Sequence, residues 1–267
     1  MEDVVNQRTP PPTGTRKVHL ATGIEAIVDA RRSVFLPSDG ILAIADLHLG
    51  YSWVQRRRGA LIPVTTPETT ATRVATLVED YRPRHLVILG DLVHQATRQA
   101  GVEEALQQLA GSLPKDVIWT VCTGNHDRNL GTLLDRLNRP IRLLPHWDMG
   151  GCRLQHGDVE TQDGSSERFV LEGSRLFHVI GHEHPALRLG DGVATEAKVP
   201  CFLIGKDVLV VPAFSDWAAG CDIQCGAFLG PVARRTAFHA AYACMGPRLL
   251  EIPLRKVNAR EPGLGSG

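Results

Sequence analysis

Polar residues of the kinds that bind metal ions recur along the chain, each time close behind an apolar stretch. Asp46 and His48 follow the first such stretch, within ILAIADLHLG at 41–50. A carboxylate beside an imidazole suits Mn, Fe, Zn or Ni better than Ca. The later residues of this kind are Asp91 after HLVIL, Asn125, His126 and Asp127 after VIWTV, His156 in LQHGD, and His182 and His184 in GHEHP. They would form a metal site if the fold brought them to one place.

Each group has an ordinary structural explanation when it is taken alone. His48 could be a buried histidine with one hydrogen-bond partner, and Asp91, which follows a glycine, could be a turn residue or a helix cap. The residues at 125–127 could be turn chemistry, and His182 and His184 could flank an edge strand. These explanations do not account for a metal-type ligand at every strand end. Nor do they account for the neighbouring glycines, which let a backbone turn tightly beside an ion.

Hydrophobic patterns predict the elements that would position these residues. Apolar runs predict buried strands at 41–50, 85–89 and 117–121, and helical patterns occupy 67–81, 103–113 and 130–137. This alternation predicts a parallel α/β core, with ligands at the carboxyl ends of its strands. Residues i and i+2 of an extended strand point to the same side, so we expect Asp46 and His48 to face one point. The segment after Gly50 is predicted to be a loop.

The second half of the chain is predicted to form a second, more antiparallel sheet packed on the first. Its short strands are expected at 152–156, 176–180, 200–204 and 208–211, followed by a helix at 231–242. Two further strands, at 18–28 and 32–36, lead into the first sheet. We therefore expect one domain at 16–254, with polar, disordered tails at 1–15 and 255–267.

Charge and cysteine content exclude several classes of protein. The 267 residues include 29 lysines and arginines against 29 aspartates and glutamates, so no global basic field favours nucleic acid. Six irregularly spaced cysteines indicate reduced thiols; Cys221 and Cys225 could bind a metal, but no second pair stands at zinc-site spacing. The sequence shows neither a signal peptide nor an apolar run of about 18 residues, the length of a membrane span. We expect a globular cytoplasmic protein without membrane association.

The order of the motifs resembles the calcineurin-like metallophosphoesterase superfamily. The series D-x-H, G-D, G-N-H-D, H and G-H-x-H is present as Asp46-Leu47-His48, Gly90-Asp91, Gly124-Asn125-His126-Asp127, His156-Gly157 and Gly181-His182-Glu183-His184. All five motifs occur in order. The fold class implied by the resemblance is α/β, a metallophosphoesterase β-sandwich of two mixed sheets flanked by helices in four αββα layers.

A narrower resemblance runs from about residue 18 to residue 220. ADLHLG, the pattern R-x-G-x-x-x-P at Arg57, Gly59 and Pro63, and then LGDLVH, GNHD, GHEHP, VPCF and VPAF are similar to the ICC-like phosphoesterases. That group includes the bacterial ligase-associated DNA damage response endonuclease. It implies a phosphodiester substrate, DNA or RNA, and an association with a DNA ligase and a helicase. The tails, the region 221–244 and residues 51–53 depart from the pattern, and such loops set the substrate.

The superfamily resemblance implies two divalent metal ions as cofactors, with manganese first and Fe, Zn, Ni or Mg as alternatives. It assigns Asp46, His48 and His184 to one ion, and Asn125, His156 and His182 to the other. Asp91 would bridge them, because one carboxylate can give an oxygen to each ion. Two ions about 3.5–4 Å apart can clamp a phosphate ester and lower the pKa of a water between them.

Two catalytic residues and three substrate-binding residues complete the expected site. The resemblance gives His126 the role of stabilising phosphoryl charge or protonating the leaving oxygen, work that suits a group titrating near neutrality. Asp127 would orient His126, or would cap a helix beginning near residue 128. Arg56, Arg57 and Arg58 would contact substrate phosphates, or would form a solvated face. His94 would lie in the outer shell of the site or on a surface helix.

The expected function is a dimetal-dependent phosphoesterase that hydrolyses phosphodiesters by attack of a metal-bridging hydroxide, in its most specific form a DNA-repair nuclease. The alternative is a phosphomonoesterase or nucleotide phosphatase with the same metal core. A third hypothesis is a non-catalytic scaffold that binds a protein partner. Such scaffolds lose metal ligands or the active-site histidine, whereas this chain keeps the whole set. The oligomeric state does not follow from the sequence.

Overall fold

A computed structural model describes residues 13–257 except 22, 62–66, 96–99, 161–175, 191–195 and 219. The tails predicted at 1–15 and 255–267 fall mostly outside the described residues. Where the two overlap, residues 13–14 form a turn, β1 begins at Thr15, and β16 ends at Val257. None of the described helices has the length and apolar character needed to cross a membrane.

In the described part of the chain, the first sheet has seven strands, which lie side by side in chain order. Strands β1 to β4 are antiparallel neighbours, and β4 to β7 run parallel. The parallel half corresponds to the predicted parallel core. Its strand β5 has the bounds predicted for the strand at 85–89. The strands are β1 (Thr15–Ala21), β2 (Ile24–Asp29), β3 (Ser33–Leu36), β4 (Ile41–Ile44), β5 (His85–Leu89), β6 (Ile118–Cys122) and β7 (Ile141–Leu144).

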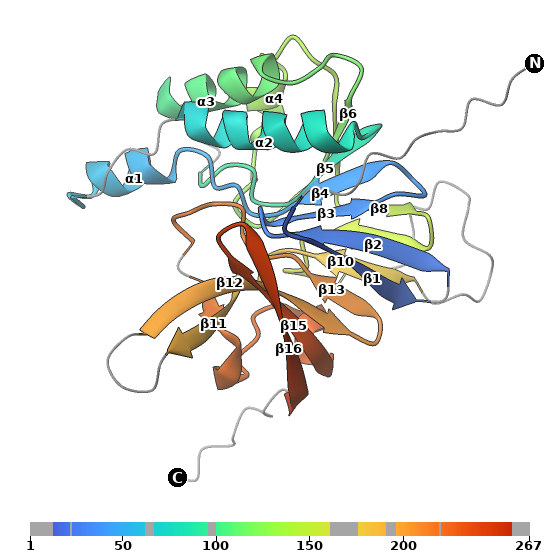
Figure 1. The fold of residues 1–267 in the computed structure, drawn as a ribbon. Helices are drawn as coiled ribbons and strands as arrows, with labels where there is room; N and C mark the ends of the chain where they lie inside the picture. The colour runs from blue at the N-terminus through green and yellow to red at the C-terminus, as the bar shows by residue number, and fades with distance from the viewer. Residues whose placement is uncertain are drawn as a thin grey trace, which may run out of the picture.

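Helices cover one face of the first sheet. Helices α2 (Pro67–Tyr81), α3 (Ala100–Gly111) and α4 (Leu130–Leu134) lie together over β4, β5 and β6 (Figure 1). Alternation along the strands divides the buried residues between two cores. Leu42, Ile44 and Ile88 pack with the helices, whereas Ile41 and Leu89 face the second sheet.

The second sheet is mixed, with a parallel centre and antiparallel margins. Strand β10 pairs in parallel with both β9 and β13, while β12 is antiparallel to β11, β13 and β15. The strands are β8 (His146–Met149), β9 (Cys152–Gln155), β10 (Phe177–Ile180), β11 (Pro185–Gly190), β12 (Glu196–Gly205), β13 (Val208–Val210), β14 (Cys221–Asp222), β15 (Phe238–Met245) and β16 (Arg248–Val257).

Packing of the two sheets produces the predicted sandwich. The core between them joins Ile41 and Leu89 to Leu154, Val179 and Leu209. On the outer side of the second sheet, a 3₁₀ turn (Ile223–Cys225) and helix α5 (Pro231–Arg234) contribute to a third core. The α/β fold of two mixed sheets flanked by helices is therefore confirmed, with a thin fourth layer.

Three local predictions were wrong. The segment after Gly50 is helix α1 (Tyr51–Arg57), not a loop, and it buries Ser52 and Val54. The run 18–28 is the hairpin of β1 and β2, where Gly23 at φ 80° accommodates the reversal. The helix predicted at 231–242 ends at Arg234, because Phe238–Met245 pairs with β12 on one side and β16 on the other.

Candidate active site

The candidate site lies where strands of both sheets end. Asp46 and His48 follow β4, and Asp91 follows β5. The N–H of Asp46 donates to the carbonyl of Gly90 at 3.2 Å, and the N–H of His48 donates to the carbonyl of Asp91 at 2.9 Å. The N–H of His182, beyond β10 of the second sheet, donates to Asp46 Oδ2 at 3.0 Å. Hydrogen bonds from backbone N–H groups therefore fix the ligand-bearing segments to one another across the two sheets.

Left-handed backbone, and not an extended strand, aims the candidate ligands. Strand β4 ends at Ile44, so the expectation that Asp46 and His48 share the side of an extended strand was wrong. Five of the eight non-glycine residues with positive φ in the described part of the chain are candidate ligands: Asp46 (52°), His48 (46°), Asp91 (48°), His182 (67°) and His184 (44°). This conformation is uncommon outside glycine, although Asp and His tolerate it better than most residues.

Two glycines next to the ligands permit close approach between motifs. A Cβ atom on Gly90 would lie 2.2 Å from His156 Nδ1, and the φ of Gly90 is 79°. A Cβ atom on Gly124 would lie 2.3 Å from Asp91 Oδ1. Each glycine thus makes room for a ligand that belongs to a different motif, which explains the expected association of glycines with the site.

Asp46, His48 and His184, here called the Asp46 group, come together as predicted. Their ligand atoms lie within 4.8 Å of one another. His184 Nε2 is 3.4 Å from His48 Nε2 and 3.5 Å from Asp46 Oδ1. Asp46 Oδ1 is buried and has no hydrogen-bond partner among the described residues. A buried carboxylate oxygen facing two imidazole nitrogens suits a divalent cation, because a cation would satisfy all three atoms.

Asn125, His156 and His182, here called the Asn125 group, also converge. His156 Nδ1 donates to the carbonyl of Leu89 at 2.9 Å, so in the neutral ring Nε2 carries the lone pair. That Nε2 lies 3.2 Å from Asn125 Oδ1 and 3.1 Å from His182 Nδ1. One amide oxygen and two imidazoles around a common point again form a set that fits a divalent ion.

Asp91 lies between the two groups. Its Oδ2 is 3.8 Å from His48 Nε2 in the Asp46 group and 3.6 Å from His156 Nε2 in the Asn125 group. Its Oδ1 accepts a hydrogen bond from the N–H of His126 at 2.9 Å. The placement is the one that a carboxylate shared by two ions requires.

Electrostatics favour the metal-binding forms of Asp46, His48 and His182. Burial would raise the pKa of Asp46, but His184, His156 and His48 lower it below its usual value. Burial lowers the pKa of His48 to about 3 and that of His182 to about 4. Ionised Asp46 and neutral imidazoles at neutral pH are ligating forms. Burial would lower the pKa of His156 and of His184, but the charge of Asp46, with that of Asp91, raises both. Burial and the charge of Asp46 raise the pKa of Asp91, a repulsion that bound cations would relieve.

Comparison with known proteins identifies the family. Residues 40–165 match the family model described as calcineurin-like phosphoesterase. This stretch is a calcineurin-like phosphoesterase domain. It contains Asp46, His48, Asp91, Asn125 and His156, in agreement with the motif series predicted from the sequence. The chain is therefore a metal-dependent phosphoric ester hydrolase.

Two solved structures match the chain, and the first of them shares its fold. The nuclease MPE of Pseudomonas putida superimposes with a TM-score of 0.64 at 24% sequence identity, covering 90% of this chain and 100% of that one. The phosphoesterase Yfce of E. coli matches with a TM-score of 0.33 at 18% identity, covering 80% of this chain and 98% of that one. No curated protein sequence matched the chain.

His126 stands at the mouth of the phosphoesterase site. Its Nδ1 donates to the carbonyl of His94 at 2.7 Å. This leaves Nε2 directed at the candidate ligands, 3.9 Å from Asp91 Oδ2. Its side chain is 34% exposed, so an incoming ester can reach it. His126 is thus an available proton donor or charge stabiliser beside the ligands.

Asp127 does not orient His126 as predicted. Its Oδ2 accepts from the N–H of Gly124 at 3.0 Å, and its Oδ1 faces the N–H of Val93 at 3.4 Å. It does not cap α4 either, since Asn129 is the N-cap. Burial raises the pKa of Asp127 to about 6. Its carboxylate therefore shapes the backbone around Asp91 and Asn125, and the carbonyl of His94 orients the His126 ring.

His94 belongs to the site and not to a surface helix. Its ring stacks on His126 with centroids 5.1 Å apart, and meets His48 and Tyr51 edge to face. Ligand atoms of His48, His94 and His126 lie within 4.8 Å of one another. Two explanations for His94 were open from the sequence, and its spacing of three residues from Asp91 was the signal for the correct one.

Sequence reasoning missed Glu183, the residue between the two histidines of GHEHP. Its buried carboxylate accepts from the N–H of Leu229 at 2.7 Å and from the N–H of Gly230 at 2.6 Å, just ahead of α5. This anchor fixes the turn that carries His182 and His184. The available signal was a carboxylate placed between two candidate metal ligands.

The three arginines lie on the surface beside the site. Arg56 and Arg57 end α1, Arg58 follows as its C-cap, and all three side chains are exposed. Burial lowers the pKa of His94 to about 4, with further contributions from His126 and then Arg58. Among the three, Arg58 is therefore the one whose charge acts on the site.

Proposed function

We propose that this phosphoesterase hydrolyses phosphodiesters and that its substrate is a nucleic-acid strand. The observation that carries the proposal is the convergence of two ligand groups on Asp91, with His126 Nε2 3.9 Å from the shared carboxylate. This arrangement presents two adjacent cation positions and one proton donor to a single ester. The Pseudomonas putida protein with the similar fold is named a nuclease, which favours a strand as substrate.

The residues that would hold the ions are the two groups themselves. Asp46, His48 and His184 would hold one ion, Asn125, His156 and His182 the other, and Asp91 both. Bound ions would neutralise phosphoryl oxygens and make a water molecule more acidic. Two carboxylates, one amide and four imidazoles form a set of intermediate hardness, and we expect manganese to support the highest activity.

The chain itself would supply the proton. His126 Nδ1 is engaged by the His94 carbonyl, so Nε2 is the atom that can donate to the departing oxygen or hold charge beside it. Gly124 and Asp127 hold the backbone of this loop, which keeps the His126 ring at a fixed distance from Asp91.

The test compares a diester with its matching monoester. Metal-stripped protein is given Mn, Mg, Zn or Ni and assayed on bis(4-nitrophenyl) phosphate and on 4-nitrophenyl phosphate. We expect kcat/KM to be higher for the diester in manganese, and no turnover in chelator. Preference for the monoester with every metal would favour the phosphatase alternative.

A second assay concerns the strand. We expect metal-dependent cleavage of labelled single-stranded or duplex DNA or RNA by the same preparation. A role in DNA repair, an association with a DNA ligase and a helicase, and a cytoplasmic location stay predictions. Proximity of the gene to ligase and helicase genes would support them.

A further inference from the structure

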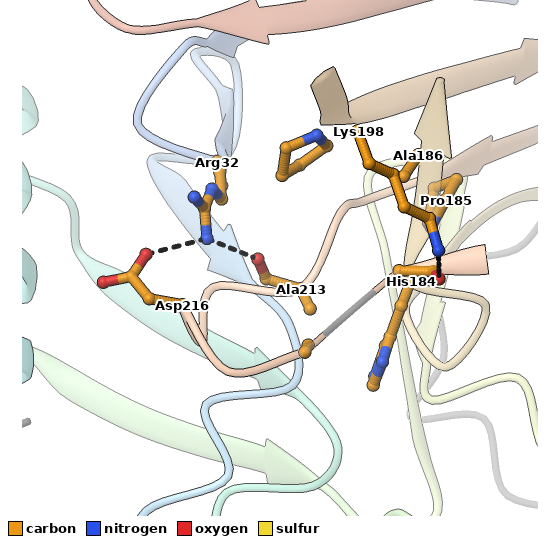
Figure 2. A pocket seen from close by; sticks show the side chains of 10 residues that line it. Arg32, His184, Pro185, Ala186, Lys198, Ala213 and Asp216 are labelled. Atoms are coloured by element: carbon orange, nitrogen blue, oxygen red, sulfur yellow. Dashed lines mark hydrogen bonds and ion pairs between the residues drawn. The ribbon is translucent and has the colours of Figure 1, made fainter. Parts of the chain in front are cut away.

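A cavity of ≈ 230 Å³ adjoins the Asp46 group at His184. His184 forms part of its wall, and Arg32, Lys198 and Asp216 bring charges to it (Figure 2). Neither Arg32 nor Lys198 belongs to a ligand group or to any motif discussed above. The cavity is therefore a separate feature that begins where the candidate metal site ends.

The charges of this wall favour an anion. Asp216 is the acidic side chain among the lining residues, and it lies between two cations, 3.0 Å from Arg32 Nη1 and 3.1 Å from Arg73 Nη1. Lys198 Nζ donates to the carbonyl of Gly220 and, among the described residues, has no carboxylate at ion-pair distance. The positive charge of Lys198 is thus available to a ligand.

Arg188, the neighbouring cation, differs from Lys198 in having carboxylate partners. Arg188 lies opposite Lys198 in the β11–β12 ladder, and it is bound by Glu196 at 3.2 Å and by Asp222 at 2.9 Å. Two acidic residues neutralise Arg188, whereas the adjacent Lys198 is held by a carbonyl group. Pairing of β11 with β12 does not require that Lys198 lack a carboxylate partner while Arg188 has two.

The wall is fixed to the metal site through the backbone. Arg32 Nη1 donates to the carbonyls of Phe214 at 3.4 Å and Ser215 at 3.1 Å, in the segment that leads to Asp216. The N–H of Ser215 in turn donates to the carbonyl of Asp46 at 3.2 Å. An anion in the cavity would therefore have a defined position relative to the Asp46 group.

We propose that this cavity is a subsite for a second phosphate group of the substrate, the one adjacent to the scissile phosphate along a nucleic-acid strand. The inference rests on the proposed function and gives it a specificity determinant. A water molecule occupies about 30 Å³, so the cavity has room for several groups of that size, as a phosphate requires. Lys198 would contact the phosphate as a point charge, and Arg32 would add its field.

The first experiment compares esters that differ by one phosphate. Thymidine 5′-(4-nitrophenyl phosphate) is assayed with and without a 3′-phosphate, and the 3′-(4-nitrophenyl phosphate) with and without a 5′-phosphate. For the wild type, we expect the added phosphate to lower KM in one of the two pairs, which also defines the strand polarity. In Lys198→Ala, the decrease in KM caused by the added phosphate should be smaller by about threefold to tenfold. This range lies between the typical effect of losing an exposed ion pair and that of losing a charge-assisted hydrogen bond.

The second experiment measures binding without turnover. Anisotropy of a fluorescent single-stranded oligonucleotide with hydrolysis-resistant phosphorothioate linkages is followed with metal-loaded protein at several salt concentrations. Each phosphate contact on a single strand contributes about 0.7 to the slope of log K against log salt. We expect the slope of Lys198→Ala to be smaller by about that amount, and Lys198→Arg to restore it.

Matched controls separate the subsite from general charge and from the proposed function. Lys115→Ala removes one exposed charge from a different part of the surface and should leave both readouts unchanged. If no diester is hydrolysed, the proposed function fails, while the salt slope still tests the subsite. The subsite proposal would be overturned if the added phosphate lowered KM equally in the wild type and in Lys198→Ala, and if the two proteins had equal slopes of log K against log salt.

Discussion

The Asp46 group and the Asn125 group are built from similar residues but are held differently. In the Asn125 group, the far nitrogen of His156 is bound by the carbonyl of Leu89, and neighbouring ligand atoms lie 3.1 and 3.2 Å apart. In the Asp46 group, the far nitrogen of His48 and one oxygen of Asp46 are buried without a hydrogen bond to any described residue.

The difference bears on how each group would bind its ion. An imidazole whose far nitrogen donates to a carbonyl has its tautomer and orientation set in advance. The Asn125 group is therefore the more preorganised of the two. The Asp46 group has more to gain from a cation, since its buried oxygen has no hydrogen bond without one. We expect the Asn125 group to bind the tighter ion and the Asp46 group the more exchangeable one.

Asp91→Asn should abolish the distinction, because Asp91 is the residue that faces both groups. An amide would present one neutral oxygen in place of a shared carboxylate, so both ions should be lost and activity should fall to that of metal-stripped protein. Metal content by atomic absorption and kcat by diester hydrolysis check this. Asp116→Asn, an exposed control, should change neither. Retention of two ions at a near-normal rate in Asp91→Asn would contradict the assignment of Asp91.

His126→Ala should leave the metal content of both groups intact and slow turnover by roughly 10²–10⁴, the usual range for acid–base assistance. The loss should be larger for alkoxide leaving groups than for 4-nitrophenolate, which departs without a proton. The measurement is kcat for the two classes of ester at equal metal content. Equal losses would exclude the proton-donor role and leave charge stabilisation, and loss of metal would make His126 a ligand.

Chelation should resolve the two groups. During titration with a chelator, we expect one ion to leave before the other. His48→Ala should weaken the more exchangeable ion, whereas His156→Ala should weaken the tighter one. His156→Ala removes a ligand and also its hydrogen bond to the carbonyl of Leu89. We therefore expect the affinity for the tighter ion to fall by at least the roughly 10–100-fold associated with the loss of an outer-shell partner. Electron paramagnetic resonance of bound manganese provides the readout. Release of both ions in one step from the wild type would contradict a difference in affinity.

Glu183→Ala tests the turn that supplies one histidine to each group. It removes the acceptor for the N–H groups of Leu229 and Gly230, and we expect the free energy of unfolding to fall by about 1–3 kcal/mol. Urea denaturation measures the loss. Glu160→Ala removes an exposed partner of Arg235 and should stay within about 0.5 kcal/mol. Equal stability of the two variants would mean that Glu183 is not an anchor.

The sequence predicted the parallel core and the convergence of ligands, because long apolar runs ending in Asp, Asn and His are strong signals. The backbone beyond those runs was not predictable in the same way. The left-handed φ values of Asp46 and Asp91 depend on hydrogen bonds between segments far apart in sequence, and local propensity contains no trace of them.

Tertiary pairing explains the other failures. Phe238–Met245 contains several alanines, which favour helix, but the strands on both sides of it decide its conformation. Pro253 and the charged residues near it made β16 hard to predict from the sequence. Proline is tolerated there because β15 is the one described strand that pairs with β16. The contact between Lys198 and Gly220 joins segments that no motif connects, so the cavity beside His184 could not be predicted.

The left-handed ligands also bear on protein engineering. Design methods favour idealised strands and avoid positive φ outside glycine, so a copy of the site on regular strand ends would aim its five left-handed ligands incorrectly. A successful transplant would have to import the short segments after β4, β5, β6, β9 and β10, together with the glycines next to the ligands. The smallest portable unit of this site is therefore a set of loops with their interlocking hydrogen bonds, together with the strand ends that they contact, such as Leu89 of β5.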